Sequence, residues 1–353
     1  MRLEVLPGAA VDGPSARWVG AVLCRDVLDG GGRPALTKGA VLVPGDEAAL
    51  RDAHPEELHL LWLDEGDVGE DAAAVRIATA VAGMGTAARS PVESQARLVA
   101  AWRGMVEVDV RALAAVNAVD GVTVFTVPDG LHVDAGRTLA GVKVTPLAID
   151  EWSLEQAERA ALSASDGAGA GILRVRPFLP LRVAAIVRQH LTDEARERFE
   201  RSLGMRSAWF GGTIEPVRYV DDSAEHVQQA LVDAARTADM VLAVGVASVD
   251  PLDVTWQSLL AAGATSIRRG LPMHPGSSYW IAELLGRPVI GVASCGMFSR
   301  RSALDLLIAR LHAGLPLDAA YLASLGHGGL LGKEAAWRIP PYEAALGDDA
   351  DEA

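Results

Sequence analysis

Residues 174–324 alternate between short apolar runs and amphipathic stretches. The apolar runs at 183–187, 240–244 and 288–292 are rich in Val, Ile, Leu and Ala, which is typical of strands buried on both faces of a parallel sheet. Stretches with apolar residues at helical spacing separate or follow them, and these predict helices over 192–203, 223–238, 254–262 and from about Leu304 to Leu311. A loop and a further strand are expected between 208 and 220. This order predicts an α/β fold with a doubly wound, mostly parallel sheet and right-handed crossovers.

The chain before residue 174 has a different pattern, in which short apolar runs are separated by Gly, Pro and Asp. This pattern predicts two smaller β-rich α+β units, over residues 1–83 and 84–173. In the first unit we expect strands within 19–28, 40–43 and 58–63, and helices over 47–52 and 71–82. In the second we expect strands over 98–108 and 123–127, a strand pair over 137–147, and helices over 109–117 and 153–163, the last capped by Ser153. Residues 325–353 form a tail whose acidic end is predicted to be disordered.

Charge and cysteine content narrow the range of functions. The formal net charge is −14, which argues against a general nucleic-acid binder because phosphate contacts need a basic surface. A small anionic ligand is compatible with this charge if basic residues gather locally. The two cysteines, Cys24 and Cys295, predict no disulfide framework and favour a reducing cytoplasm. No apolar run reaches about 18 residues, and residues 1–8 lack the apolar core of a signal peptide, so we expect a soluble protein without a membrane span or a signal peptide.

The first candidate site follows the apolar run 240–244. Gly245, Ser248, Asp250 and Asp253 stand at the carboxyl end of this predicted strand, where ligands of open α/β sheets bind. The two carboxylates could hold Mg²⁺, a hard cation that takes oxygen ligands. The alternative is structural: Asp253 caps the helix that begins at Val254, and Asp250 is a turn residue. Both interpretations stay open at this point.

A second loop of the same kind follows the run 288–292. It contains Ser294 and Cys295, and the free N–H groups of the next helix, with Arg300 and Arg301 beside them, are predicted to receive an anion such as a phosphate. Cys295 is either a reactive thiol or a small buried residue. Between the two loops, turn and cationic residues are mixed over 268–276. His274 and His327 lack a second ligand at metal-site spacing, which favours an ordinary surface or core histidine for each.

The chain resembles a known family over nearly all of residues 15–331, most strongly in the motifs of residues 174–331. In the molybdopterin-binding domain of molybdenum cofactor adenylyltransferases and molybdenumtransferases, a strand ends in a Thr-Gly-Gly-x-Ser loop followed by aspartates, and 244–253 occupies that place here. The family's Pro-Gly turn resembles 273–276, and its Leu-Pro-Gly-Asn loop resembles 292–295. The chain is more similar to a group of molybdopterin-binding proteins that carry an extra N-terminal region, a Ser-Val-Asp-Pro-Asp-Asp segment, here 248–253, and Gly-His-Gly-Gly-Leu, here 326–330.

The resemblance implies a small anionic pterin ligand, molybdopterin or the molybdenum cofactor. The cofactor-binding residues predicted from it are Gly245, Ser248, Pro275, Gly276, Ser294 and Cys295, to which Arg300 is added because it lies inside the second loop, and the residues predicted for catalysis and Mg²⁺ are Asp250 and Asp253. Three functions follow as hypotheses: a cofactor-binding or carrier protein, a Mg²⁺-dependent molybdenumtransferase that inserts molybdate, and a degenerate assembly partner that binds no pterin. The family also implies a homo-oligomer, with a molybdoenzyme or another cofactor-biosynthesis protein as partner.

Departures from the family pattern favour the binding hypothesis. Val246 stands where the family prefers glycine, and a β-branched side chain hinders positive φ and close backbone approach. Ala293 and Ser294 replace Pro-Gly, which adds a side chain to a loop expected to face the ligand. The family's Thr-Gly-x-Glu turn after the first strand is replaced by 188–191, Arg-Gln-His-Leu.

Overall fold

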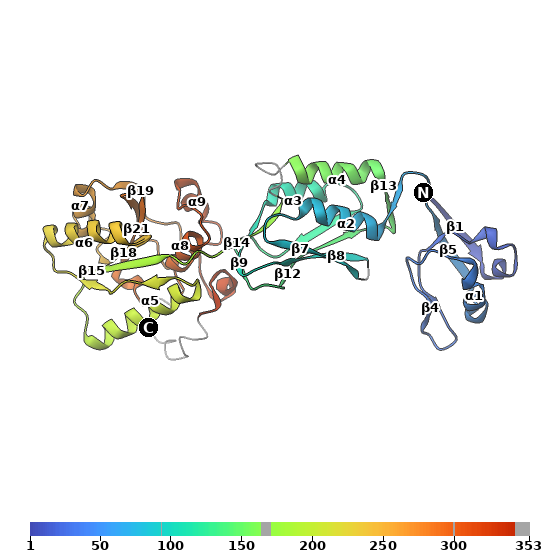
Figure 1. Cartoon of the computed structure of the whole chain (residues 1–353), viewed down its shortest axis with the longest axis horizontal. Helices are drawn as coiled ribbons and strands as arrows, with labels where there is room; N and C mark the ends of the chain where they lie inside the picture. The colour runs from blue at the N-terminus through green and yellow to red at the C-terminus, as the bar shows by residue number, and fades with distance from the viewer. Residues whose placement is uncertain (93, 164–170, 299–300, 343–353) are drawn as a thin grey trace. The chain divides into compact units, whose positions relative to one another are not determined.

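The chain is a mixed α/β protein with several sheets (Figure 1). The computed structural model describes residues 1–92, 94–163, 171–298 and 301–342, with the side chain of Cys295 left out. Contacts between Cα atoms divide the chain into two units. Unit 1 comprises residues 1–102, 106–129 and 134–175, and unit 2 comprises 103–105, 130–133 and 176–353. The predicted boundary at residues 83–84 falls within unit 1 and stays a prediction.

Unit 1 begins with a small β-rich core. Strands β1 (Arg2–Pro7), β5 (Glu57–Trp62) and β2 (Val22–Leu23) form an antiparallel sheet in the order β1-β5-β2, and β3 (Val27–Leu28) pairs with β4 (Pro34–Leu36). Helix α1 (Glu47–Ala53) packs beside them and buries Leu50. The core contains Trp18, Leu23, Leu42 and Leu60, all fully buried.

The rest of unit 1 is built around the antiparallel sheet β10-β12-β8-β7. Its strands are β7 (Thr86–Val92), β8 (Gln95–Ala100), β10 (Val122–Thr126) and β12 (Thr138–Val144). Helix α2 (Glu70–Val81) packs on β8 and β12 with Ala73, Ala74, Ile77, Ala78 and Val81, a spacing that lines one helix face. Further elements are α3 (Val110–Asn117), α4 (Glu151–Ser163), the pair β6 (Asp67–Gly69) and β13 (Ala148–Asp150), and β14 (Leu173–Pro177).

Unit 2 contains a seven-stranded sheet in the order β16-β15-β18-β21-β20-β19, with β17 also paired to β15. Strand β15 pairs in parallel with β16, β17 and β18, β18 pairs in parallel with β21, and β20 and β19 continue the sheet in antiparallel pairing. The strands are β15 (Arg182–Val187), β16 (Thr213–Ile214), β17 (Arg218–Tyr219), β18 (Met240–Val246), β19 (Thr265–Arg269), β20 (Trp280–Leu284) and β21 (Arg287–Ala293). Strand β9 (Gly104–Val108) pairs with the short strand β11 (His132–Val133), and the paired residues 104–105 and 132–133 belong to unit 2.

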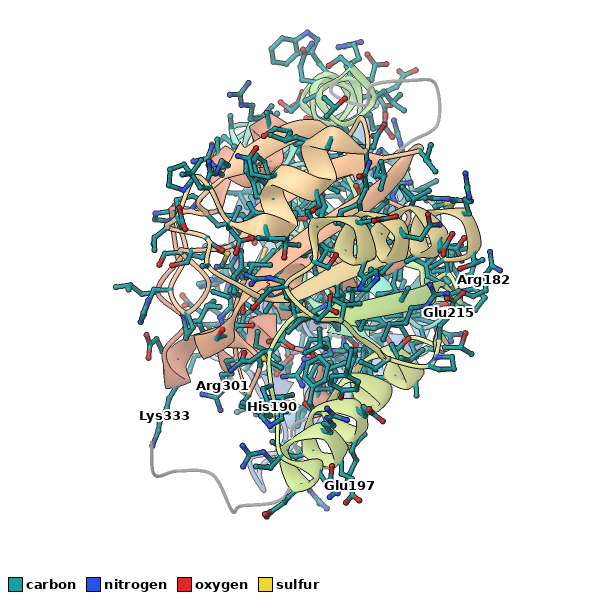
Figure 2. The ribbon with its side chains drawn as sticks, turned by 90° about the vertical axis from the view of Figure 1, so that its left-hand side faces the viewer. Arg182, His190, Glu197, Glu215, Arg301 and Lys333 are labelled. Carbon is teal, nitrogen blue, oxygen red and sulfur yellow. The ribbon has the colours of Figure 1, made fainter. Side chains whose placement is uncertain are left out.

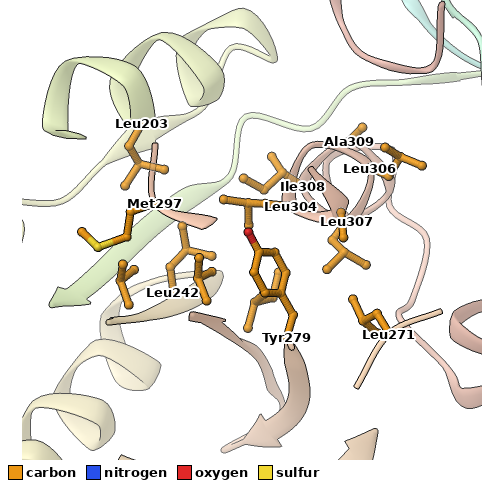
Figure 3. Close-up of a cluster of buried hydrophobic side chains, with 14 of the residues drawn as sticks. Leu203, Leu242, Leu271, Tyr279, Met297, Leu304, Leu306, Leu307, Ile308 and Ala309 are labelled. Carbon is orange, nitrogen blue, oxygen red and sulfur yellow. The ribbon is translucent and has the colours of Figure 1, made fainter. Parts of the chain in front are cut away.

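Helices cover the sheet of unit 2 on both faces, because alternate side chains of its strands enter two separate cores. Val183 and Val187 of β15 pack with α5 (Asp193–Trp209) and α8 (Ala303–His312), and Figure 3 shows Tyr279 directed towards the leucines of α8 in this core. Ala184 and Ile186 pack instead with α6 (Ala224–Thr237) and α7 (Val254–Ala261). The remaining helices are α9 (Ala319–Ser324) and the 3₁₀ turns η1 (Gly8–Asp12), η2 (Ser15–Arg17), η3 (Pro44–Asp46), η4 (Ser294–Gly296) and η5 (Lys333–Arg338).

The structure corrects several predicted elements of unit 1. The single strand expected over 98–108 is two strands, β8 and β9, separated by a turn at 101–103. The strand pair expected over 137–147 is the one strand β12, followed by the short β13. Ser153 is not the cap of α4: the helix begins at Glu151, and the carboxylate of Asp150 accepts the Ser153 N–H at 2.9 Å.

Unit 2 also differs from prediction at two places. Helix α5 continues through Gly204 to Trp209, beyond the predicted end at 203, because buried contacts of its later residues outweigh the low helix propensity of one glycine. Strands β19 and β20 were not predicted. The sequence of β19, Thr-Ser-Ile-Arg-Arg, has little apolar alternation because it forms the edge of the sheet.

An aromatic cluster in unit 2 makes its stability depend on pH. The ring of His132 lies 6.0 Å from that of Phe178 and 5.8 Å from that of Trp209, and both of its nitrogens are buried without a hydrogen-bond partner among the described residues. Burial, with a smaller effect of the Arg103 charge, lowers the pKa of His132 to about 4. Burial also lowers the pKa of His312, which stacks on Phe210.

We expect the free energy of unfolding of unit 2 to fall by about 2 kcal/mol for His132 alone between pH 7 and pH 5. The unfolded chain binds a proton below its ordinary pKa of 6.5, whereas the folded chain resists protonation until about pH 4, so stability is present above pH 6.5 and is lost as the pH falls. Chemical denaturation of wild type and His132→Phe at both pH values measures this loss. The His132→Phe variant should show a smaller loss, and His226→Gln, at an exposed histidine, should behave like wild type. An equal loss in wild type and His132→Phe would contradict this assignment.

Candidate functional site at the carboxyl edge of the unit 2 sheet

The two loops singled out from the sequence start next to each other. Strands β18 and β21 are parallel, and Val246 and Ala293 are register partners at their carboxyl ends. The loop 247–253 therefore begins beside the turn η4, which contains Ser294 and Cys295. Ser294 is exposed, and the predicted ligand Arg300 lies outside the described residues. His190 follows β15 at this edge, and Figure 2 shows it well apart from Arg182 and Glu215 at the opposite edge.

Gly245 allows the loop after β15 to approach β18. It adopts a φ of +80°, and a Cβ there would lie 2.9 Å from the Cβ of Gln189 and 3.2 Å from its Oε1. Val246 does not need the positive φ that its place in the motif suggested, because Gly245 supplies it. The side chain of Val246 is buried in the core beneath α6 and α7, so it does not obstruct the loop.

Two buried polar atoms at this edge have no hydrogen-bond partner in the described part of the chain: Ser248 Oγ and Gln189 Oε1. Buried polar groups are nearly always paired in folded proteins, so an unpaired one calls for an explanation such as a bound ligand. Ser248 is held by its backbone, since its carbonyl accepts a hydrogen bond from Arg269 Nη2 at 3.2 Å. The guanidinium of Arg269 in turn lies 4.7 Å from the ring centroid of Trp256. The loop is thus anchored through its main chain, while the hydroxyl of Ser248 has no partner among the described residues.

The structure gives Asp253 a helix-capping role, as the structural alternative predicted. Its Oδ1 accepts the N–H of Trp256 at 3.2 Å, and its Oδ2 accepts the N–H of Ala247 at 3.1 Å and also binds Arg188 Nη2. Asp250 is exposed, and its Oδ1 accepts the N–H of Leu252 at 2.8 Å. Within the described ranges no group of three or more His, Cys, Asp and Glu side chains could hold a metal ion. The metal role of both aspartates stays a prediction.

The prediction that the helix after β21 offers free N–H groups to an anion is wrong. The N–H of Ala303 donates to Pro275 O at 2.9 Å, that of Leu304 donates to Ser302 Oγ at 3.2 Å, and that of Asp305 donates to Ser302 O at 3.1 Å. A capping box of Ser302 and Asp305 thus closes the first turn of α8. The first turn of α8 therefore does not provide the predicted anion site.

Pro275 and Gly276 meet the amino end of α8. Besides the Pro275 carbonyl, Gly276 contributes a close contact: at its φ of +123°, a Cβ would lie 2.5 Å from the Cβ of Ala303. The same loop pairs with the Gly-His-Gly-Gly-Leu segment through a parallel bridge between His274 and Leu330. His274 and His327 are both exposed. The structure therefore brings two of the resemblance-bearing segments, 273–276 and 326–330, into contact, and 273–276 also contacts the start of α8.

Sequence reasoning missed the basic residue at the centre of this edge. Arg188 follows β15 directly and contacts Asp222, Asp253 and Thr255. Its position directly after a buried strand could have indicated a site residue, but residues 188–191 were interpreted only as a departure from the family pattern. Asp222 was missed because it follows the two-residue strand β17, which has no hydrophobic pattern of its own.

Comparisons with known proteins leave the family open. No protein-family model matches the sequence, and no curated protein matches it either. Among solved structures, a molybdopterin biosynthesis moea protein from Pyrococcus horikosii aligns at 13% identity and a TM-score of 0.30, covering 89% of this chain and 75% of that chain. A molybdenum cofactor biosynthesis protein from Pyrococcus furiosus aligns at 12% identity and a TM-score of 0.26, covering 90% of this chain and 66% of that chain. Likeness at these scores does not establish a shared fold or function.

In the part of the chain that the structure describes, no helix is both long enough and apolar enough to cross a membrane.

Proposed function

We propose that unit 2 binds a phosphorylated pterin, molybdopterin or the molybdenum cofactor, at the carboxyl edge of its sheet, and that the protein acts as a binding or carrier protein in the biosynthesis or delivery of this cofactor. The observation that carries the proposal is the pair of buried, unpartnered atoms Ser248 Oγ and Gln189 Oε1 beside Gly245, within the loop that carries the sequence resemblance. A pterin offers ring N–H groups and ring nitrogens that suit such atoms.

The sheet topology supports this location. We infer that unit 2 is of the doubly wound type, because β17 and β18 flank β15 and helices lie on both faces. The chain then leaves β15 in one direction through α5 and returns across it through α6. Ligands of such sheets bind where the strand order reverses, which here is between the carboxyl ends of β15 and β18. Gln189 and Ser248 follow these two strands.

The contacts of Asp253 favour binding over metal-assisted transfer. Both of its carboxylate oxygens are engaged by main-chain N–H groups and by Arg188, and only 2% of its side chain is exposed. A carboxylate in this state would have to lose the Arg188 ion pair before it could bind Mg²⁺. No contact of Asp250 or Asp253 supports the alternative of molybdate insertion. The proposal is therefore confined to holding the pterin.

Release of pterin from the purified protein tests the proposal. The full chain is produced in cells that make molybdopterin, purified, denatured and oxidised, and the fluorescence of the released pterin is measured. We expect wild type to release pterin and Ser248→Ala to release several times less, because the variant lacks the hydroxyl that a bound ligand satisfies. A blank from wild type would overturn the proposal.

The stability of the same variants separates a ligand contact from a structural one. Because Ser248 Oγ has no partner among the residues that the structure describes, Ser248→Ala should change the free energy of unfolding by less than about 0.5 kcal/mol without ligand. Ser207→Ala is the matched control: Ser207 Oγ is also buried and has no partner in the described part of the chain, but it lies on α5 near the opposite edge. This control should retain the pterin of wild type. If both serine variants lose pterin equally, Ser248 is not a specific ligand contact.

A further inference from the structure

Arg188 joins three segments at the carboxyl edge of the sheet. Its Nε donates to Thr255 Oγ1 at 2.9 Å, its Nη2 binds Asp253 Oδ2, and its Nη1 donates to Asp222 Oδ1 at 2.6 Å. The arginine follows β15, Asp222 follows β17, and Asp253 and Thr255 stand at the start of α7. The guanidinium therefore lies beside the two loops that contain Gln189 and Ser248.

The two carboxylate partners of Arg188 differ in burial. The side chain of Asp253 is 2% exposed and that of Arg188 is 16% exposed, whereas that of Asp222 is 81% exposed. Asp253 neutralises the arginine from the interior and is fixed there by the N–H groups of Ala247 and Trp256. Asp222 contacts the arginine from the solvent side, where an ion pair contributes little because water and salt screen it. Nη1 is consequently the donor of Arg188 that another anion can reach.

We propose that Arg188 receives the phosphate group of the ligand through Nη1 in place of Asp222, which makes Asp222 an internal competitor for the anion site. This inference rests on the proposed function and names the residue that recognises the phosphate end of the ligand. Arginine suits this role because its planar guanidinium presents donors in a fixed fork that fits phosphate oxygens. When the phosphate replaces Asp222, the ion pair between Arg188 and Asp253 stays intact, so no buried charge loses its partner. The exposed Asp222 contact gives way to a charge-assisted bond with a group that carries more negative charge.

The competing carboxylate explains how an anionic ligand can be both bound and released. In a chain of net charge −14, a phosphate at this edge depends on a local arginine. Asp222 fills the vacated position when the ligand leaves, so that Arg188 is never without an anion. Such competition lowers ligand affinity, which suits a protein that hands its ligand over.

The neighbouring aspartates allow a matched test. Asp222→Asn and Asp221→Asn remove the same charge at adjacent exposed positions, but Asp221 binds His226 and the N–H of Ser223 rather than Arg188. Binding of inorganic phosphate to the full chain is measured by calorimetry and by thermal shift at constant ionic strength. We expect Asp222→Asn to lower the Kd for phosphate about two- to fivefold, the range of an exposed ion pair. Asp221→Asn should leave the Kd unchanged. Equal effects of the two variants, or no effect of Asp222→Asn, would overturn the proposal.

A third variant isolates Arg188. Arg188→Lys keeps the charge but loses the fork, so it should weaken phosphate binding and abolish the gain from Asp222→Asn in the double variant. If Arg188→Lys does not fold, the two aspartate variants still decide the outcome. Pterin release from the same proteins separates the two proposals. If wild type releases pterin but Asp222→Asn changes neither phosphate nor pterin binding, only the role of Arg188 is refuted. If Asp222→Asn tightens phosphate binding but wild type releases no pterin, only the proposed function is refuted.

Discussion

Replacing Asp305 with alanine is expected to lower the free energy of unfolding of unit 2 by about 3–5 kcal/mol, the cost of removing one partner of a buried ion pair. The side chain of Asp305 is 0% exposed and that of Arg206 is 6% exposed, and Arg206 Nε lies 2.9 Å from Asp305 Oδ1. Tyr342 also donates to this oxygen, and Ser302 N–H donates to Oδ2 at 2.8 Å. The alanine variant leaves the guanidinium buried without its carboxylate and opens the capping box of α8. Urea denaturation measures the loss.

A second aspartate distinguishes the ion pair from simple helix capping. Asp318 caps α9 by accepting the N–H of Tyr321 at 2.8 Å and is exposed. Asp318→Ala should cost about 1 kcal/mol, as is usual for the loss of an N-cap. Similar losses in Asp305→Ala and Asp318→Ala would show that the buried ion pair contributes nothing beyond a cap.

The pKa of the Tyr342 hydroxyl, raised well above 10 by burial and then by Asp305, fits a tyrosine that stays protonated and donates to the Asp305 carboxylate.

Substituting Gly276 with alanine should lower the free energy of unfolding by about 3 kcal/mol, because the variant combines backbone strain with a steric clash. The residue has a φ of +123°, and the added Cβ would lie 2.5 Å from that of Ala303, at the point where the Pro275 carbonyl accepts the first N–H of α8. The clash should also push the 273–276 loop away from the helix. Thermal or chemical denaturation measures the loss in free energy of unfolding, and pterin release measures the effect on ligand binding at the carboxyl edge of the sheet.

Gly263→Ala is the control for this substitution. Gly263 has a φ of +86° but no atom within 4 Å of the position of a Cβ, so alanine there should cost only the strain, about 1 kcal/mol. If Gly276→Ala costs no more than Gly263→Ala, the close contact between the 273–276 loop and α8 is wrong.

The central elements of unit 2 could be predicted from the sequence because their patterns are strong. Strands β15, β18 and β21 lie within two residues of the predicted runs, since apolar segments buried on both faces leave little ambiguity. Helices α6 and α7 begin at the capping residues Ser223 and Asp253. Strand β19 escaped prediction because it forms the edge of the sheet, where polar residues are tolerated. The apolar strand β20, which lies between β21 and β19, was not predicted either.

Only the positions of the loops of the candidate site could be predicted from the sequence. That 245–253 and 293–295 stand at one sheet edge follows from strand order, and the register of Val246 with Ala293 fits it. The partners of each group could not be predicted, because they are set by contacts between distant segments. Arg188 and Asp253 are 65 residues apart, and the Pro275 carbonyl that occupies the Ala303 N–H comes from another loop. These partners decide which groups remain available to a ligand.

Hydrogen exchange with and without pterin tests most directly whether the carboxyl edge of the unit 2 sheet is the ligand site. Mass spectrometry of the full chain follows the amides of 188–192 and 247–253 at the carboxyl edge, and those of 213–215 and 237–239 at the opposite edge. Added molybdopterin should slow exchange in 188–192 and 247–253 and leave 213–215 and 237–239 unchanged, because only the first pair of segments holds Gln189, Ser248 and Arg188. Protection confined to 213–215 and 237–239, or no protection in either pair, would contradict the assignment of this edge.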